Sequence, residues 1–321
     1  MSLKQQLLTA LEQHRDTFLS GQKLADALGV SRNAVWKAIC ALREEGYQIK
    51  AVTNAGYQLA TNCDILSADG IRTHLAPTYQ DIQIKVYANV DSTNDEAKRL
   101  LANGLKDKAL IVANSQTHGK GRQGRSFYSP PGSGVYMSLI LQPKADLSQA
   151  IATTTMAAVA VTEAIEETTT ISPQIKWVND VYVDGKKICG ILTEAETDFE
   201  SGQVQSIIIG IGVNIGIDHL PDELQNIAGS LPSATFKRNE LIARITNHLI
   251  PLVMHPEDKA YLDSYRSHSL VIGQRITYYI RGEAFTAKAL EIDDDGGLII
   301  KKDDGSIDIL KSGEISLRIS G

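Results

Sequence analysis

The sequence predicts an α+β protein of three parts, and three observations lead to this prediction. Residues 1–62 hold short amphipathic helices and a glycine turn, residues 63–269 alternate strand-like runs with helices and glycine-rich loops, and residues 270–321 alternate short strands with turns. A length of 321 residues suits two or three domains. We therefore predict an N-terminal winged helix-turn-helix, a central α/β domain with a mixed sheet and a small C-terminal β-barrel, with domain boundaries at these ranges.

The composition indicates a globular, cytoplasmic protein. Hydrophobic residues make up 43% of the chain and charged residues 22%, which is ordinary for folded domains. The N-terminus has no apolar signal region, and the most apolar run, Ile207–Ile217, is broken by glycines and too short to span a bilayer. Three cysteines without CxxC spacing and seven scattered histidines indicate reduced thiols and no zinc site. We expect no membrane partner.

The N-terminal part has the pattern of a winged helix-turn-helix. Ser20 can cap a short helix that buries Leu24, Gly29 permits a tight turn, and Ser31 can cap the next helix. Two short helices joined by a glycine turn are typical of a helix-turn-helix. Two strand-like segments on either side of residues 54–56 would then form the wing.

The second helix of this pair would be the recognition helix of a DNA-binding domain. Its candidate contact residues are Ser31, Arg32, Asn33 and Lys37, which suit phosphate and base contacts. The whole chain has a net charge of -6, whereas the charges in residues 1–62 sum to +2. So small a positive charge favours a dimer on a two-part operator. Helix pairs of this shape also serve as plain packing units, and that is the alternative to DNA binding.

A cationic, glycine-rich loop in the middle of the chain is the main sign of a ligand site. No acidic residue occurs between Lys108 and Lys144, and this window contains the loop Gly119–Arg125. Glycine N–H groups and cations together suit a polyanion. The loop matches the dinucleotide-binding and P-loop patterns as text, but both need a helix directly afterwards, and Ser129–Gly132 cannot open one. We therefore exclude these two folds and place the loop between two strands.

Polar groups also follow two other predicted strands. The segment Asp91–Asp95 starts a helix, and the spacing of Ser92 and Asp95 is that of a capping box. The segment Pro173–Asp180 reads as a strand that ends in polar groups, and a two-residue hairpin turn at Asp184–Gly185 follows it.

Three residues in the next strands indicate a cleft or a close neighbour. Lys187 stands where an apolar strand begins, which is costly unless the side chain faces a cleft or a partner. Gly210 and Gly212 lie in a buried strand, where glycine suggests close approach by a ligand or by another part of the chain.

These motifs occur in an order similar to that of the biotin protein ligases. They are Ser92–Asn94, Gly119–Arg125, Lys176–Asp180, Lys187–Leu192, Gly210–Asn214 and Gly313–Arg318. With the winged helix, the whole chain resembles the bifunctional type, in which one protein is biotin ligase and biotin-operon repressor. Lys120 replaces an arginine usual in the family, which keeps the charge and loses a bidentate fork, and Val178 replaces a proline. The stretch from Asp218 to Ser233 has no match.

The resemblance implies a fold and a reaction. The central domain would be of the class II synthetase/biotin-lipoate ligase type, and the tail an SH3-like barrel. The biotin carboxylate would attack the α-phosphate of ATP, with Mg²⁺, to give biotinyl-5′-AMP and pyrophosphate. A lysine of a biotin carboxyl-carrier domain would then take the biotin. The partners implied are that carrier domain, operator DNA and a second copy of the chain.

The resemblance also implies roles for residues of this sequence. The biotin-binding residues would be Ser92, Thr93, Asn94, Gln116, Lys120, Gly121, Arg122 and Lys187. The adenylate-binding residues would be Lys120, Arg122, Arg125, Asn179 and Asn214. The catalytic residues would be Arg122, Lys187, Lys176 and Asp180, with Asp180 as proton acceptor or metal ligand. Two alternatives stay open: a biotin-responsive transcription factor without ligase activity, against which the retained cations count, and a ligase whose winged helix no longer binds DNA.

Overall fold

The computed structural model describes residues 2–143, 150–197, 204–234, 236–280, 283–311 and 315–317. The chain forms two compact units, one of Met1–Gln80 with Lys237–Ala243 and one of Asp81–Phe236 with Arg244–Gly321. Gly313, Glu314 and Arg318 of the C-terminal motif lie outside the described residues. No helix in the described part of the chain is long and apolar enough to cross a membrane.

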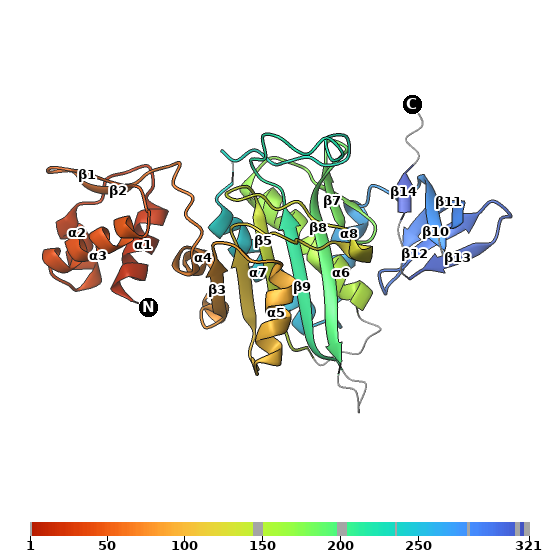
Figure 1. Cartoon of the computed structure of the whole chain (residues 1–321), viewed down its shortest axis with the longest axis horizontal. Helices are drawn as coiled ribbons and strands as arrows, with labels where there is room; N and C mark the ends of the chain where they lie inside the picture. Colours follow the sequence, from red (N-terminus) through yellow and green to blue (C-terminus); the bar gives the residue numbers. More distant parts are fainter. Residues whose placement is uncertain are drawn as a thin grey trace. The chain divides into compact units, whose positions relative to one another are not determined.

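The N-terminal unit contains the predicted winged helix-turn-helix. Ser20 Oγ accepts from the backbone N–H groups of the first turn of its helix, Ser31 Oγ accepts from Ala34 N, and Gly29 has a φ of 64°. The predicted caps, turn and wing are therefore confirmed. The elements, labelled in Figure 1, are α1 (Leu3–Gln13), α2 (Gly21–Leu28), α3 (Arg32–Glu44), β1 (Ile49–Val52), β2 (Gly56–Leu59), α4 (Ala68–His74) and the 3-10 turn η1 (Pro77–Tyr79).

The core of this unit lies between α1, α3 and the wing. Leu7, Leu8 and Ile39 are fully buried there. The unit also includes the start of α7 (Arg238–Met254), because the guanidinium of Arg238 is nearly buried and pairs with the carboxylate of Asp64 at 2.6 Å.

The second unit is built on a seven-stranded mixed sheet, as predicted. The strand order is β3-β4-β5-β9-β8-β7-β6, with β3 parallel to β4 and the other neighbours antiparallel. The strands are β3 (Gln83–Tyr87), β4 (Ala109–Ala113), β5 (Val135–Leu141), β6 (Gln174–Lys176), β7 (Asp180–Val183), β8 (Lys186–Thr197) and β9 (Val204–Val213). The glycine-rich loop lies between β4 and β5, as expected, with one 3-10 turn, η2 (Arg122–Gly124).

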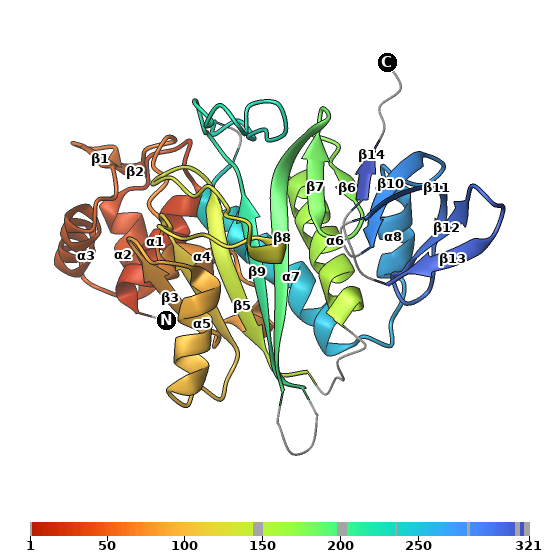
Figure 2. The same cartoon turned by 45° about the vertical axis from the view of Figure 1, so that its right-hand side comes forward.

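Helices cover both faces of this sheet. In Figure 2, α5 (Thr93–Ala102) lies in front of the sheet and α6 (Ala150–Thr168) behind it. Ala97 of α5 packs with Ile111, Ile140 and Ile208 of β4, β5 and β9. The candidate site lies on the same face of the sheet as α5, and the start of α5 and the glycine-rich loop both line it.

The segment Pro173–Asp180 is not a single strand, so that prediction is wrong. β6 ends at Lys176, the chain reverses over residues 177–179, and Lys176 pairs with Asp180 across the turn. Side-chain bonds hold this reversal, because the Trp177 indole N–H donates to the Gly296 carbonyl at 2.9 Å and Asn179 Nδ2 donates to Ile191 O at 2.9 Å.

The C-terminal region is a five-stranded antiparallel sheet of order β13-β12-β11-β10-β14. Its strands are β10 (Arg275–Ile280), β11 (Glu283–Ile292), β12 (Leu298–Lys302), β13 (Ile307–Leu310) and β14 (Ile315–Leu317). Two helices precede it. They are α7 (Arg238–Met254) and α8 (Tyr261–Ser267). Arg266 of α8 joins the sheet to the helices through Ile292 O and the Asp294 carboxylate.

Candidate functional site

One cavity of about 380 Å³ is lined by every residue that was predicted from the sequence to bind biotin or ATP or to take part in catalysis. Its walls come from the start of α5, the glycine-rich loop, the β6–β7 turn, β8, β9 and residues 220–228. The predicted residues among its lining are Ser92, Thr93, Asn94, Gln116, Lys120, Gly121, Arg122, Arg125, Lys176, Asn179, Asp180, Lys187 and Asn214.

The lining carries a large excess of positive charge. Its cations are Lys120, Arg122, Arg125, Lys176 and Lys187, and Asp180 is the only carboxylate among the lining residues that the structure describes. Clustered cations in a partly enclosed site attract an anion strongly, because the surrounding protein screens charge less than water does. The cavity is therefore suited to a ligand with several negative charges.

Polar contacts hold four of these groups in place. Lys187 Nζ lies 2.6 Å from Asp180 Oδ1, which explains how an ammonium group is tolerated at the start of an apolar strand. Arg122 Nη1 donates to Asn179 Oδ1 at 3.1 Å. Lys176 Nζ lies 5.7 Å from the centre of the Tyr182 ring, within cation–π range.

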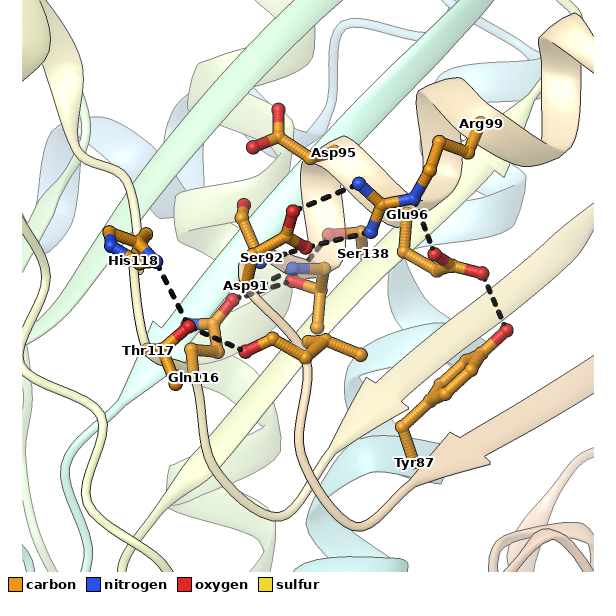
Figure 3. Close-up of polar contacts among 12 residues, drawn as sticks. Tyr87, Asp91, Ser92, Asp95, Glu96, Arg99, Gln116, Thr117, His118 and Ser138 are labelled. Carbon is orange, nitrogen blue, oxygen red and sulfur yellow. Dashed lines mark hydrogen bonds and ion pairs between the residues drawn. The ribbon is translucent and has the colours of Figure 1, made fainter.

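A buried polar network forms the wall near the start of α5 (Figure 3). Gln116 Oε1 accepts from Thr93 N at 2.8 Å, and Gln116 Nε2 donates to Ser129 Oγ at 2.9 Å. Ser138 Oγ lies within hydrogen-bond distance of Thr93 Oγ1 and of Asn94 Oδ1, at 2.7 and 2.6 Å. These contacts fix the orientation of the Thr93, Asn94 and Gln116 side chains in the cavity wall.

Asn94 is held by both ends of its amide. Its Nδ2 donates to Glu194 Oε2 at 2.8 Å, and its Oδ1 accepts from Ser138. Glu194 in turn pairs with Lys98 at 2.7 Å. Because both ends of the amide already bond to the protein, the geometry favours a supporting role for Asn94 over direct recognition of a ligand.

An ion pair fixes the turn just before α5. Both oxygens of the Asp91 carboxylate accept from Arg99, at 2.7 and 2.9 Å, and Asp91 Oδ1 also accepts from Ser92 N (Figure 3). The Arg99 guanidinium, together with the Ser92 N–H, holds the pKa of Asp91 well below its usual range. Arg99 also bonds Glu96, which accepts from the Tyr87 hydroxyl, and burial with this hydrogen bond raises the pKa of Tyr87 to about 12.

The capping box predicted at this turn does not form. Ser92 is the N-cap of α5, but its side chain makes no capping hydrogen bond. Asp95 does not act as its partner, because its carboxylate pairs with Lys120 at 2.6 Å. The spacing thus predicts the start of the helix correctly, while Ser92 faces the cavity and Asp95 anchors the glycine-rich loop.

Gly210 and Gly212 are needed because neighbouring side chains approach the strand. A Cβ at Gly210 would lie 2.3 Å from Asn94 Oδ1, and one at Gly212 would lie 2.5 Å from the Phe127 ring. The prediction of close approach is confirmed, and the groups that approach are these two side chains.

Several cavity residues were not predicted. Phe127, Ser129, Ser138 and Glu194 support or line the cavity, and so does the unassigned segment, through Leu220, Leu224, Ile227 and Ala228. This segment is attached to β8, because Lys187 N donates to Ile227 O at 3.0 Å. The spacing of Leu220, Leu224 and Ile227 is an apolar pattern that could have identified it.

The predicted DNA-contact residues are all exposed on the second helix of the helix-turn-helix. Ser31, Arg32, Asn33 and Lys37 lie at or near the N-terminal half of α3, and the Ser31 hydroxyl is also the helix cap. Trp36 is exposed among them, with 53% of its surface accessible, and it was not predicted.

Asp91→Asn is expected to weaken biotin binding several-fold with little change in kcat, because it loosens the turn that presents Ser92 and Thr93. Both side chains of the Asp91–Arg99 pair are more than 40% exposed, so the stability it adds is at most about 1 kcal/mol. The folded-state pKa of Asp91 is lowered, so this stability is fully present above pH ~4 and declines as the pH falls from there toward the lowered pKa of the folded state. Biotin KM values and urea unfolding at pH 7 and pH 3 measure both effects. A stability difference between wild type and variant that is no smaller at pH 3 than at pH 7 would contradict the assignment.

Comparison with known proteins gives the family. Three family models match the chain: the biotin/lipoate A/B protein ligase family over residues 86–214, a helix-turn-helix domain over 4–58, and the biotin protein ligase C-terminal domain over 271–318. All three kinds of domain are those expected from the sequence.

Relatives and solved structures agree with these matches. The bifunctional ligase/repressor BirA of Bacillus subtilis is 38% identical over 314 residues, covering 95% of both chains. BirA of Escherichia coli is 28% identical over 307 residues, covering 94% of this chain and 93% of that one. A structure of biotin protein ligase from Aquifex aeolicus with biotin and ATP is 30% identical, has a TM-score of 0.61, and covers 74% of this chain and 98% of its own. The chain belongs to the biotin protein ligase family, in its bifunctional ligase/repressor branch.

Proposed function

We propose that the chain activates biotin with ATP and transfers it to a lysine of a biotin carboxyl-carrier domain. The observation that carries this proposal is the convergence of five cations on one cavity whose described lining residues include a single carboxylate. A cavity for binding biotin alone would need to neutralise only one negative charge, whereas a reaction between a carboxylate and a triphosphate brings several negative charges together.

In the first step, a biotin carboxylate oxygen attacks the α-phosphorus of ATP. The bond from that phosphorus to the bridging oxygen breaks, and pyrophosphate leaves with the electron pair. Arg122 and Lys187 are placed to neutralise the carboxylate and the α-phosphate, because both are held in the lining by Asn179 and Asp180. Lys120 and Arg125 belong to the glycine-rich loop and would hold the adenylate.

In the second step, the carrier lysine attacks the carbonyl carbon of the mixed anhydride, and AMP leaves. The attacking amine must lose a proton, and Asp180 is the only carboxylate in the described lining that could accept it. Lys176 adds positive charge near the departing phosphate. Ser92 and Thr93 would meet the ureido ring of biotin, and Gln116, whose amide is also bonded at both ends, would hold Thr93 in place for this contact. Asn94 and Asn214 support the walls: Asn214 Nδ2 donates to Gly229 O at 2.9 Å.

The residues fit a Mg²⁺ ion held mainly by ATP. Among the described residues no group of three or more His, Cys, Asp or Glu side chains could hold a metal. Mg²⁺ commonly binds through substrate phosphates and one or two carboxylates, and Asp180 would supply a carboxylate here. When bound, the ion neutralises charge on the departing pyrophosphate. We expect this chemistry in the cytoplasm, where the three free cysteines would stay reduced.

The test of the ligase function is direct. The full-length chain is incubated with biotin, Mg-ATP and a purified carrier domain, and the mass of the carrier is measured. We expect one added biotin on one lysine, with one pyrophosphate released for each biotin. Biotin binding without any transfer or pyrophosphate would support a ligand-sensing transcription factor.

A second proposed function is repression by a dimer on operator DNA. It is supported by the exposed Arg32, Asn33 and Lys37 on a helix-turn-helix whose caps and turn form as expected. The small positive charge of the N-terminal domain favours dimeric binding. Sedimentation of the chain with biotin and ATP is expected to give a dimer. A monomer at every concentration under these conditions would rule out the dimeric mode.

A further inference from the structure

The exposed face of α3 has an unexplained apolar member. Val35, Ile39 and Leu42 are fully buried in the core of the N-terminal unit. Trp36 points away from that core and is 53% exposed, whereas the other tryptophan of the chain, Trp177, is 3% exposed. About half of the Trp36 surface is left in water, and tryptophan is enriched where proteins contact partners, so Trp36 is a candidate for such a contact.

The neighbours of Trp36 indicate which partner. Positions 32 and 33 lie one helical turn before it, and Lys37 follows it, so Trp36 sits in the middle of a stripe of exposed polar and cationic groups. It is the fifth residue of the helix, in the half that faces base edges when such a helix enters the major groove. Because the cations around Trp36 can contact phosphates, DNA is favoured as its partner over an apolar protein surface.

The chemistry of the major groove narrows the contact further. The C5-methyl group of thymine is the apolar group that base pairs present there, and apolar side chains recognise it. Asn33, three residues earlier, has the amide that pairs with adenine. We propose that Trp36 is a specificity residue that packs its indole ring on a thymine methyl group in each operator half-site. This proposal rests on the DNA-binding function proposed above.

The experiment uses thymine and uracil as a matched pair, since deoxyuridine lacks only the methyl group. Duplexes are selected from a random-sequence pool with the full-length chain, biotin and ATP. Each thymine of the selected site is then replaced by uracil in turn. At one position per half-site we expect wild type to lose about three- to fivefold in affinity, the value of one buried methyl group.

Trp36→Ala is expected to lose at least fivefold on the thymine duplex and to be indifferent to uracil at that position, while Trp36→Phe stays sensitive. Phe18→Ala changes an exposed aromatic residue outside α3, and it should keep the wild-type uracil effect. The midpoint of thermal unfolding of Trp36→Ala, measured by circular dichroism, should equal that of wild type if the variant is folded.

Three results would overturn the proposal. If Trp36→Ala retains the wild-type uracil effect, Trp36 does not contact the methyl group. If it weakens all duplexes equally and uracil has no effect on wild type, the indole contacts the backbone or another protein chain. If wild type selects no duplex at all, the DNA-binding function itself fails. Only this last result touches the proposed function, so the two failures are distinguishable.

An independent readout uses tryptophan fluorescence. Trp177 is almost fully buried but lines the ligand cavity, so acrylamide quenching is measured in a Trp177→Phe background, where Trp36 is the only tryptophan of the sequence. Quenching is expected to fall when the selected duplex binds, and to stay unchanged on adding biotin and ATP alone. Protection by biotin and ATP without DNA would place Trp36 in a protein contact and contradict the proposal.

Discussion

Lys187→Ala should slow pyrophosphate release by about a hundred- to a thousandfold, because it removes a positive charge from the cavity wall where we propose that the biotin carboxylate and the α-phosphate meet. The loss should appear mainly in kcat, with a smaller effect on the KM for biotin. Arg122→Ala is expected to behave similarly, since Arg122 is fixed in the same lining by Asn179. Single-turnover pyrophosphate release measures the adenylation step apart from transfer.

The neighbouring Lys186 provides a matched control. It is exposed, precedes Lys187 on β8, and does not belong to the cavity lining. Lys186→Ala should therefore stay close to wild type, while Lys187→Arg should recover part of the rate by restoring the charge. Equal rates for Lys187→Ala and wild type would refute the assignment of Lys187 to the reaction.

Gly210→Ala is expected to cost about 1–3 kcal/mol of stability and to weaken biotin binding strongly. The added methyl group would lie 2.3 Å from Asn94 Oδ1, and Asn94 cannot easily move because Ser138 and Glu194 hold its amide. A shift of Asn94 would disturb Thr93, which shares Ser138 as a partner. Thermal unfolding and isothermal titration with biotin measure the two losses.

A double variant separates the steric effect from the binding effect. Adding Asn94→Ala to Gly210→Ala removes the atoms that clash, so part of the lost stability should return. Biotin affinity should stay low, because Asn94 no longer supports the start of α5. If Gly210→Ala alone matches wild type in both measurements, the close contact between β9 and α5 is not a constraint.

Local signals predicted the helix-turn-helix correctly. A cap or a glycine turn depends on a few adjacent residues, so Ser20, Gly29 and Ser31 were sufficient to indicate where the helices begin and end. The candidate ligand residues were identified through motifs whose order resembles that of a family, and the structure brings these residues into one cavity. Their individual roles remain proposals.

The parts that could not be predicted depend on packing between distant segments. Glu194 and Ser138 occur in strands, and only the sheet register places both beside Asn94. The reversal after Lys176 depends on a bond from Trp177 to Gly296, which is 119 residues further along the chain. Trp36 was not identified because a single apolar residue beside a buried stripe looks like part of the core until its exposure is known.

We propose that one product, the biotinyl-5′-AMP made in the cavity, serves both the transfer to the carrier lysine and the binding of operator DNA. The most direct test is the affinity of the full-length chain for a duplex selected from a random-sequence pool, measured with biotin alone, ATP alone, both together, and synthetic biotinyl-5′-AMP. We expect tight binding only with both substrates or with the adenylate. The affinity of Lys187→Ala for the duplex should rise with biotinyl-5′-AMP and should not rise with biotin and ATP. Equal affinity of the wild-type chain for the duplex under all four conditions would show that the adenylate does not control DNA binding.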